Sequence, residues 1–334
     1  MFTTAEPQSS KRVIKIMLWI LLVIVLLLIV AWFWLTQPLL SRPQPNGVRT
    51  VDPARLEAHV RKLSSDFSPR DIGHPENLDR AAAYIASELT QAGGSVSEQG
   101  YRVEGNSYRN VIARFGPEGG ERIVVGAHYD AFGPLPGADD NASGVAGLLE
   151  LARLLGQQAP AMRVELVAFS TEEPPYFRTT GMGSSVHAQA LRKENVNVRA
   201  MLSLEMIGYF SDANSSQHFP VGILSALYPS RGNFIGVVGR VSDGLLVRRI
   251  KGAMSGAAPL PVHSINAPSV IPGVDFSDQL SYWDAGYNAV MITDTAFYRN
   301  RNYHTAHDTA EKLDYKRMAM VVEGVYAAVN ELSK

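Results

Sequence analysis

Short apolar runs alternate with longer amphipathic stretches over most of this chain, and this alternation limits the possible folds more than any other feature. Runs of strand length occur at 110–115, 123–127, 164–169, 200–206, 234–238 and 289–293. Apolar residues recur with helical spacing at 55–65, 78–92, 145–155, 184–193, 243–254 and 316–332. Several of the strand-length runs are apolar throughout, as is typical of a parallel sheet buried on both faces. The sequence therefore predicts an α/β fold with a mostly parallel central sheet and helices on both faces.

A run of apolar residues without any charge precedes this region, from Met17 to Leu35. A helix needs about 20 such residues to cross the hydrocarbon core of a bilayer. A cleaved signal peptide would have a shorter apolar core that ends in small residues, whereas this run ends in the aromatic cluster Trp32-Phe33-Trp34. A buried core helix fits poorly because the run is terminal and apolar on all sides. We therefore expect an uncleaved transmembrane helix at 17–35.

The charges around this run predict how the chain is oriented in the membrane. Lys11, Arg12 and Lys15 precede it, and Arg42 follows it. The positive-inside rule places residues 1–16 in the cytoplasm and the rest outside, in the periplasm or the extracellular space. The proline-containing segment 36–53 is expected to be a linker, and 54–334 a single domain. One span is too few for a transporter.

Composition excludes several classes of function. The 334 residues include no cysteine, so disulfides, thiolate metal sites and a cysteine nucleophile are excluded. Lys and Arg total 31 and Asp and Glu total 32. This balance gives no basic excess for binding nucleic acid. The oligomeric state cannot be inferred from these numbers.

Polar side chains follow four of the predicted strands, where each strand ends. His128 follows 123–127, Glu172 and Glu173 follow 164–169, Glu205 follows 200–204, and His304 follows 289–293 across a polar loop. Because ligands bind beyond the carboxyl ends of parallel strands, we expect these side chains to share one site. Each motif alone has an ordinary interpretation as a surface loop or a solvated face, but their shared position favours a site.

A further acidic loop, 137–144, lies directly before a predicted helix and contains Asp139, Asp140 and Ser143. Taken alone, it is a turn with Ser143 as the helix N-cap. Zinc, however, binds histidine nitrogen and carboxylate oxygen. Two zinc ions at about 3.5–4 Å carry four positive charges, which three carboxylates and one hydroxide would balance. His128, Asp140, Glu173, Glu205 and His304 make such a neutral set.

Five segments occur along the chain in this order: GAHYDAFG, GADDNASGVAGLLELARLL, FSTEEPP, SLEMIG and YHTAHDT. Together they resemble the zinc peptidases of family M28, which include bacterial leucyl aminopeptidases and the catalytic domains of glutamate carboxypeptidases. The resemblance covers about residues 50–334 and implies a zinc-exopeptidase, phosphorylase/hydrolase-like fold.

The resemblance implies a role for each of these residues. His128 and Glu205 would bind one zinc, Glu173 and His304 the other, and Asp140 would bridge them. Cobalt or manganese could replace zinc in vitro.

The catalytic roles are implied in the same way. Glu172 would be the general base, with metal-bound hydroxide as the nucleophile that attacks a peptide bond. Asp130 would orient His128 through its second nitrogen, and Asp308 would act likewise on His304. The resemblance also implies a cis peptide bond between Asp140 and Asn141.

The chain departs from the family pattern at two points. Glu205 stands where many members have aspartate. Ser277-Asp278-Gln279 stands where many have Ser-Asp-His. Neither departure removes one of the five expected metal ligands.

Two alternatives to a membrane-anchored di-zinc aminopeptidase remain open: a glutaminyl cyclase-like enzyme with one zinc, and a non-catalytic scaffold with the peptidase fold. Carboxypeptidase-like or amidohydrolase activity also remains possible. The substrate is expected to be a peptide. Candidate residues for lining its pocket are Arg178, Tyr209, Tyr298 and Arg299.

Overall fold

The computed structural model describes residues 8–39 and 50–334, which include one eight-stranded sheet with the order β1-β2-β4-β3-β5-β8-β6-β7. The strands are β1 (Ser95–Val103), β2 (Asn106–Phe115), β3 (Arg122–His128), β4 (Arg163–Phe169), β5 (Val198–Glu205), β6 (Ile235–Gly239), β7 (Val262–Asn266) and β8 (Ala289–Thr293). Neighbouring strands β4, β3, β5 and β8 run parallel. β2 joins them antiparallel at one side and β6 at the other, so the sheet is mixed around a parallel centre.

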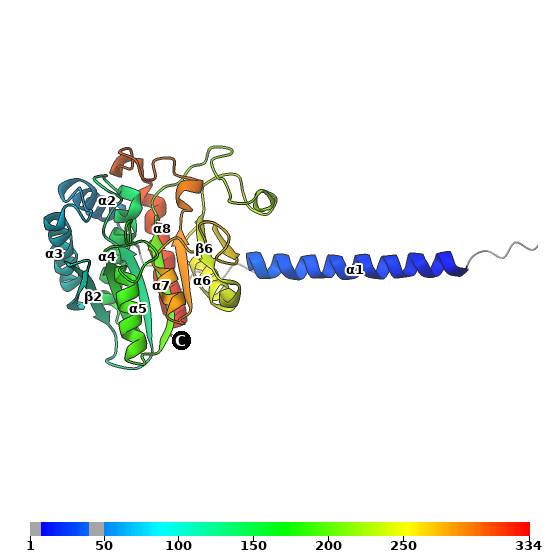
Figure 1. The fold of residues 1–334 in the computed structure, drawn as a ribbon, viewed down its shortest axis with the longest axis horizontal. Coiled ribbons are helices and arrows are strands. Elements are labelled where there is room, and N and C mark those ends of the chain that lie inside the picture. The colour runs from blue at the N-terminus through cyan, green and yellow to red at the C-terminus, as the bar shows by residue number, and fades with distance from the viewer. Residues whose placement is uncertain (1–7, 40–49) are drawn as a thin grey trace, which may run out of the picture.

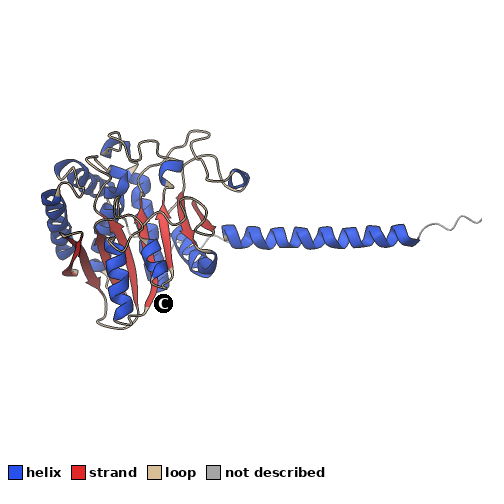
Figure 2. Cartoon of the chain, viewed as in Figure 1, coloured by secondary structure: helices blue, strands red, loops and turns tan. Residues whose placement is uncertain are grey.

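Helices cover both faces of the sheet (Figure 2). They are α2 (Pro53–Arg61), α3 (Pro75–Gln91), α4 (Gly144–Gln157), α5 (Gly183–Lys193), α6 (Gly244–Ala257), α7 (Gln279–Asp284) and α8 (Tyr315–Leu332). Side chains alternate across a strand, and β3 shows this clearly. Ile123 and Val125 pack in the cluster that contains α2, α3, α4, α6 and α8, whereas Val124 packs with α5 and α7. This confirms the predicted α/β fold with two covered faces.

The predicted strands and helices are all present, with ends shifted by a few residues. The sequence did not indicate β1, β7 or α7. β1 and β7 are the two outermost strands, so each is paired on one side only and is partly exposed. Their sequences, SVSEQGYRV and VHSIN, therefore lack the continuous apolar run that marked the central strands.

The N-terminal helix α1 (Gln8–Thr36) extends away from the domain (Figure 1). It includes the predicted span 17–35 and begins before it. Its segment Arg12–Thr36 is long and apolar enough to cross a membrane, and none of its most apolar window is buried against protein. A buried core helix is therefore excluded. Of the expected linker, residues 36–39 lie against the domain, and residues 40–49 lie outside the described part of the chain.

Candidate active site

The ends of the parallel strands and two loops bring the five expected ligands together. His128 ends β3 and Glu205 ends β5, while Glu173 lies just after β4. Asp140 lies in η2 (Ala138–Ser143), before α4, and His304 lies in the loop after β8. These side chains form two groups of three that could each hold a metal ion: His128, Asp140 and Glu205, and Asp140, Glu173 and His304.

Asp140 belongs to both groups, and each of its carboxylate oxygens faces a different histidine. Its Oδ1 lies 3.4 Å from His128 Nε2, and its Oδ2 lies 3.0 Å from His304 Nε2. The remaining ligand atoms are near: Glu205 Oε2 is 3.4 Å from His128 Nε2, and Glu173 Oε1 is 3.5 Å from His304 Nε2. Both histidine Nε2 atoms and Glu173 Oε1 are buried without a hydrogen-bond partner in the described structure. This donor set fits two zinc ions with one bridging carboxylate.

The pKa values of the buried side chains in the cluster also favour bound cations. Burial raises the pKa of Glu173 to about 8, and Asp140 adds to this effect. Burial also raises the pKa of Glu172 well above its ordinary value. Burial alone would lower the pKa of His304, but Asp140 and Glu173 outweigh it and raise that pKa to about 9. So many buried carboxylates need either protons or further cations, and divalent metal ions would replace the protons.

Glu172 is buried beside the cluster but belongs to neither group of three. Its Oε2 lies 3.9 Å from His128 Nε2, within reach of one intervening water. The backbone amides of Glu172 and Glu173 both donate to Asp130, at 3.2 Å to Oδ1 and 3.1 Å to Oδ2. One carboxylate thus holds the backbone of both neighbouring glutamates.

Asp130 and Asp308 hold backbone more directly than they hold histidine. His128 Nδ1 lies 3.2 Å from the backbone oxygen of Asp130 and 3.6 Å from its Oδ1. Asp308 accepts hydrogen bonds from the backbone amides of Asp139 and Asp140, at 3.0 and 3.1 Å. We expected Asp308 to orient His304, but its described bonds fix the loop that carries Asp140.

Asn141 ties this loop to the end of β5. Its Nδ2 donates to the carbonyl of Leu204 at 2.8 Å, and its Oδ1 accepts from the amide of Gly144 at 3.1 Å. The peptide bond between Asp140 and Asn141 is cis, as the resemblance implied. Ser143 stands at the N-cap position of α4, but its hydroxyl donates to the carbonyl of Asp139 and makes no capping bond to the helix.

Arg70 holds both ends of the loop between His128 and Asp140. Its fully buried guanidinium donates to the carbonyl groups of Tyr129, Pro136 and Gly137, each at 2.9 Å, and also to Leu63. This role was not predictable, because a single arginine far from the motifs cannot be distinguished by sequence from a surface residue.

Two aromatic rings beside His304 were also missed. The imidazole lies between Phe132, with ring centroids 3.9 Å apart, and Tyr303, at 3.7 Å. Burial raises the pKa of Tyr303, and the carboxylates Asp140 and Glu173 raise it further, so this phenol stays protonated and can donate. The adjacency of Tyr303 and His304 in the sequence was the one available signal.

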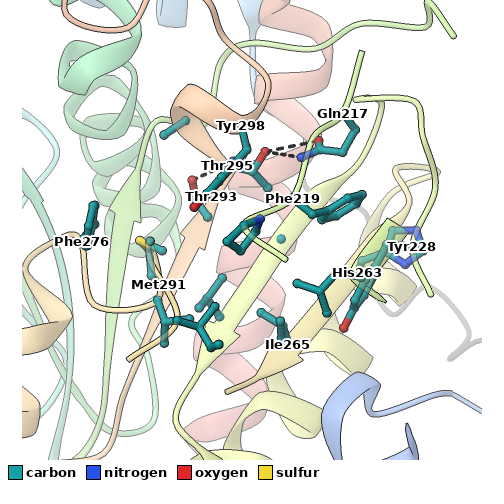
Figure 3. Close-up of a pocket in the computed structure, with 18 of the residues that line it drawn as sticks. Gln217, Phe219, Tyr228, His263, Ile265, Phe276, Met291, Thr293, Thr295 and Tyr298 are labelled. Atoms are coloured by element: carbon teal, nitrogen blue, oxygen red, sulfur yellow. Dashed lines mark hydrogen bonds between the residues drawn. The ribbon is translucent and has the colours of Figure 1, made fainter. Parts of the chain in front are cut away.

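An apolar cavity of about 110 Å³ extends from the cluster toward β6 and β7 (Figure 3). Glu205 and Tyr303 line its end at the cluster. The rest of its wall includes Phe219, Ile265, Phe276 and Met291. A cavity of about 150 Å³ accommodates a benzene ring, so this one matches a single apolar side chain in size.

Of the four residues that we considered for a substrate pocket, Tyr298 lines the cavity. Arg178 forms an ion pair with Asp275. Arg299 is buried and donates to Gln217 Oε1 and to the carbonyl of Tyr209. Both arginines thus have partners within the protein, and Nη2 of the buried Arg299 has no hydrogen-bond partner in the described structure.

The segment that departs from the family pattern lies next to Glu205. Ser277 Oγ donates to Glu205 Oε2 at 2.7 Å, which fixes that carboxylate. Gln279 Nε2 donates to the carbonyl of Val274 and takes no part in the two groups of possible ligands.

Comparisons with known proteins identify the family of this chain. The model of peptidase family M28 matches residues 110–329. The chain is 48% identical over 289 residues to the uncharacterized protein YfbL of Escherichia coli K12, covering 84% of this chain and 88% of that protein. It is 24% identical over 315 residues to leucine aminopeptidase 1 of Ajellomyces capsulatus, and the match covers 84% of this chain and 76% of that protein.

Solved structures share the fold. The zinc aminopeptidase BSAP of Bacillus subtilis superposes with a TM-score of 0.68 at 16% identity, covering 86% of this chain and 96% of that one. A glutaminyl cyclase of Bacteroides thetaiotaomicron bound to N-acetylhistamine superposes with a TM-score of 0.64 at 20% identity, covering 85% and 99%. With the family match across the whole ligand region, the chain belongs to peptidase family M28, a family of zinc peptidases.

Proposed function

We propose that this protein is a membrane-anchored di-zinc aminopeptidase that removes an apolar residue from the amino terminus of peptides. One observation carries the metal assignment: the two oxygens of Asp140 face different histidines, each of which has its own second carboxylate. His128 and Glu205 would hold one zinc, Glu173 and His304 the other, and Asp140 would bridge both.

Two zinc ions would lower the pKa of a bound water and polarise the scissile carbonyl. The chain itself supplies the proton transfer. Glu172 is buried beside both groups of ligands without belonging to either, so it can accept a proton from water and deliver it to the leaving amine. Asp130 fixes the backbone of Glu172 through its carboxylate. The protonated hydroxyl of Tyr303 can donate a hydrogen bond to the substrate carbonyl as negative charge develops there.

Electrostatics favour an aminopeptidase over a carboxypeptidase. A carboxypeptidase needs a cation for the substrate's terminal carboxylate. The nearby candidates Arg178 and Arg299 are already engaged with Asp275 and Gln217. The cavity would accept the first side chain of the substrate.

A glutaminyl cyclase-like activity is the second candidate, since a cyclase of Bacteroides thetaiotaomicron shares the fold. Such an enzyme is expected to use one zinc. Metal content of the purified protein by mass spectrometry separates the two: we expect two ions per chain, and saturation at one would favour the cyclase. An assay panel of aminoacyl, acidic-dipeptide, N-acyl and N-terminal glutaminyl substrates then tests the reaction. We expect hydrolysis of aminoacyl substrates with apolar first residues, and hydrolysis of N-acyl substrates alone would contradict the proposal.

The anchor is part of the same proposal. Helix α1 would cross the membrane once, with residues 1–16 in the cytoplasm and the catalytic domain at 54–334 outside, joined by the linker 36–53. The length of Arg12–Thr36 and the basic residues before it support this orientation. Protease added to intact spheroplasts should digest the domain after Leu35, and its protection would contradict the topology.

A further inference from the structure

The last turn of α1 packs against the domain beside η4 (Val241–Asp243) and the start of α6. Trp34 Nε1 donates to the carbonyl of Val241 at 2.9 Å. Gly244 lies so close to the indole that a Cβ atom there would be 3.0 Å from the ring. The guanidinium of Arg248 lies 5.1 Å above the ring of Phe33. The domain therefore touches the helix at its aromatic end.

Side chains of the domain also satisfy the end of the helix. The last four carbonyl groups of an α-helix lack partners within the helix. Lys251 Nζ donates to the carbonyl groups of Thr36 and Gln37, at 2.7 and 3.0 Å, and Ser264 Oγ donates to Thr36 O at 2.8 Å. A cation at this end also opposes the helix dipole favourably. These bonds make a defined joint between α1 and the domain.

This joint determines how deep the domain surface around Val241 lies relative to the membrane. The apolar run of α1 continues to Leu35, so Trp34 belongs at the membrane–water interface, where indole rings gather. Val241 is hydrogen-bonded to Trp34 and must lie at the same depth. Val241 and Leu245 are apolar yet 46% and 72% exposed. Arg248 follows Leu245 by three residues, so it lies on the same side of α6.

We propose that the surface formed by Val241, Leu245 and Arg248, here called the interfacial patch, rests in the headgroup layer of the membrane that α1 spans. The inference rests on the proposed anchoring of α1 and goes beyond it, since a tether alone would leave the domain free in solution. Val241 and Leu245 remove apolar surface from water at the acyl boundary. Arg248 faces lipid phosphate.

One residue that holds the end of α1 also lines the active-site cavity. Ser264, whose hydroxyl holds the end of α1, lines the apolar cavity, and its carbonyl accepts a hydrogen bond of 2.7 Å from Tyr228, another lining residue. Figure 3 shows Tyr228 and His263 at the β7 side of that cavity. In Figure 1, α1 leaves the domain on the side of α6 and β6. The cavity wall and α1 are thus joined through Ser264.

Site-directed spin labelling tests the patch directly, because the chain has no cysteine of its own. The full chain carrying Leu245→Cys, with a nitroxide label, is reconstituted in vesicles of phosphatidylcholine and phosphatidylglycerol. Collision rates with oxygen, which concentrates in lipid, and with a water-soluble nickel complex are measured. We expect the oxygen-to-nickel ratio at Leu245 to be at least double that of a label at Ala83, an exposed residue of α3 at the opposite end of the domain (Figure 1).

A label at Leu26, inside the span, separates the two proposals. If Leu26 is accessible to oxygen and protected from nickel while Leu245 matches Ala83, the patch is wrong and the anchor stands. If Leu26 is itself open to nickel, the anchor fails and the patch fails with it. Trp34→Phe removes the indole donor and part of the ring that lies beside Gly244, and we expect a more mobile label spectrum at Leu245. An unchanged spectrum would contradict the joint.

Discussion

The two groups of candidate ligands that share Asp140 are held by different means. His128 and Glu205 end adjacent parallel strands, and Glu205 accepts hydrogen bonds from Ser277 and Asn141. His304 lies on a loop with a left-handed backbone (φ 54°), and its side chain is 22% exposed. Aromatic rings stack on its imidazole. The sheet positions the first group, whereas loop packing positions the second, so we expect the second metal to be released first.

Asp140→Ala removes the carboxylate that both groups share, so we expect both groups to lose their metal. We expect zinc content to fall from two ions per chain toward none and hydrolysis to fall below detection. Metal analysis and peptidase assay on the same preparation check this. Asp212→Ala, at an exposed aspartate paired with Arg317, is the control and should keep both metals. Retention of two ions by Asp140→Ala would exclude the bridge.

Substitutions of the neighbouring residues Glu172 and Glu173 should affect catalysis and metal binding differently. Glu172→Gln removes the proposed base but no ligand, so we expect kcat to fall by about 10²–10⁴-fold with both metals kept. Glu173→Gln should lose the metal at the His304 group and activity together. Circular dichroism controls for folding. The reverse pattern, in which Glu172→Gln loses metal and Glu173→Gln keeps it, would exchange the two assignments.

Phe132→Ala tests whether ring packing holds the second group. Partners that orient a metal ligand typically contribute about 10–100-fold in metal affinity. We expect a loss of that order at the Glu173–His304 group alone, measured by chelator competition, with anomalous diffraction to show which ion leaves. Ser277→Ala is the matched change at the other group and should weaken the His128–Glu205 ion instead. Equal losses at both groups in either variant would show that the two are not held independently.

The smallest expected effect is on stability against pH in the chelated protein. The metal-free pKa values of Glu173, about 8, and His304, about 9, are raised above their ordinary values. Both groups thus stabilise the folded chain in their protonated forms, and this contribution is lost as pH rises through those values. The Tm of the chelated protein should fall between about pH 7 and about pH 9. The increase in Tm that zinc produces should therefore become larger over the same pH range. A zinc-induced increase in Tm that becomes smaller as pH rises would contradict the raised pKa values of Glu173 and His304.

The strand ends made the first group predictable and the second only partly so. His128, Glu173 and Glu205 directly follow apolar runs, so strand periodicity alone placed them at one edge. Phe132, Tyr303 and Arg70 act through packing or backbone contacts that no spacing in the sequence encodes. Asp308 was recognised as important, but which group its carboxylate would meet depended on how two loops fold toward each other.

The cavity could not be foreseen for a related reason. Its lining comes from segments around 217–228, 271–276 and 295–298 and from β6, β7 and β8. These segments have no shared periodicity, and β7 was not predicted at all. The resemblance supplied the ligands but no information on these loops.

Arg70 bears on where a working fragment of this protein can begin. A fragment starting at Asn110 would keep all five candidate ligands and the proposed base. It would lack the guanidinium that satisfies the carbonyl groups of Tyr129, Pro136 and Gly137. Each buried carbonyl left without a partner costs about 1–3 kcal/mol, and the loop from His128 to Asp140 would lose its fastening at both ends. The proposed catalytic unit therefore begins before its first candidate ligand, because Arg70, between α2 and α3, holds the loop from His128 to Asp140.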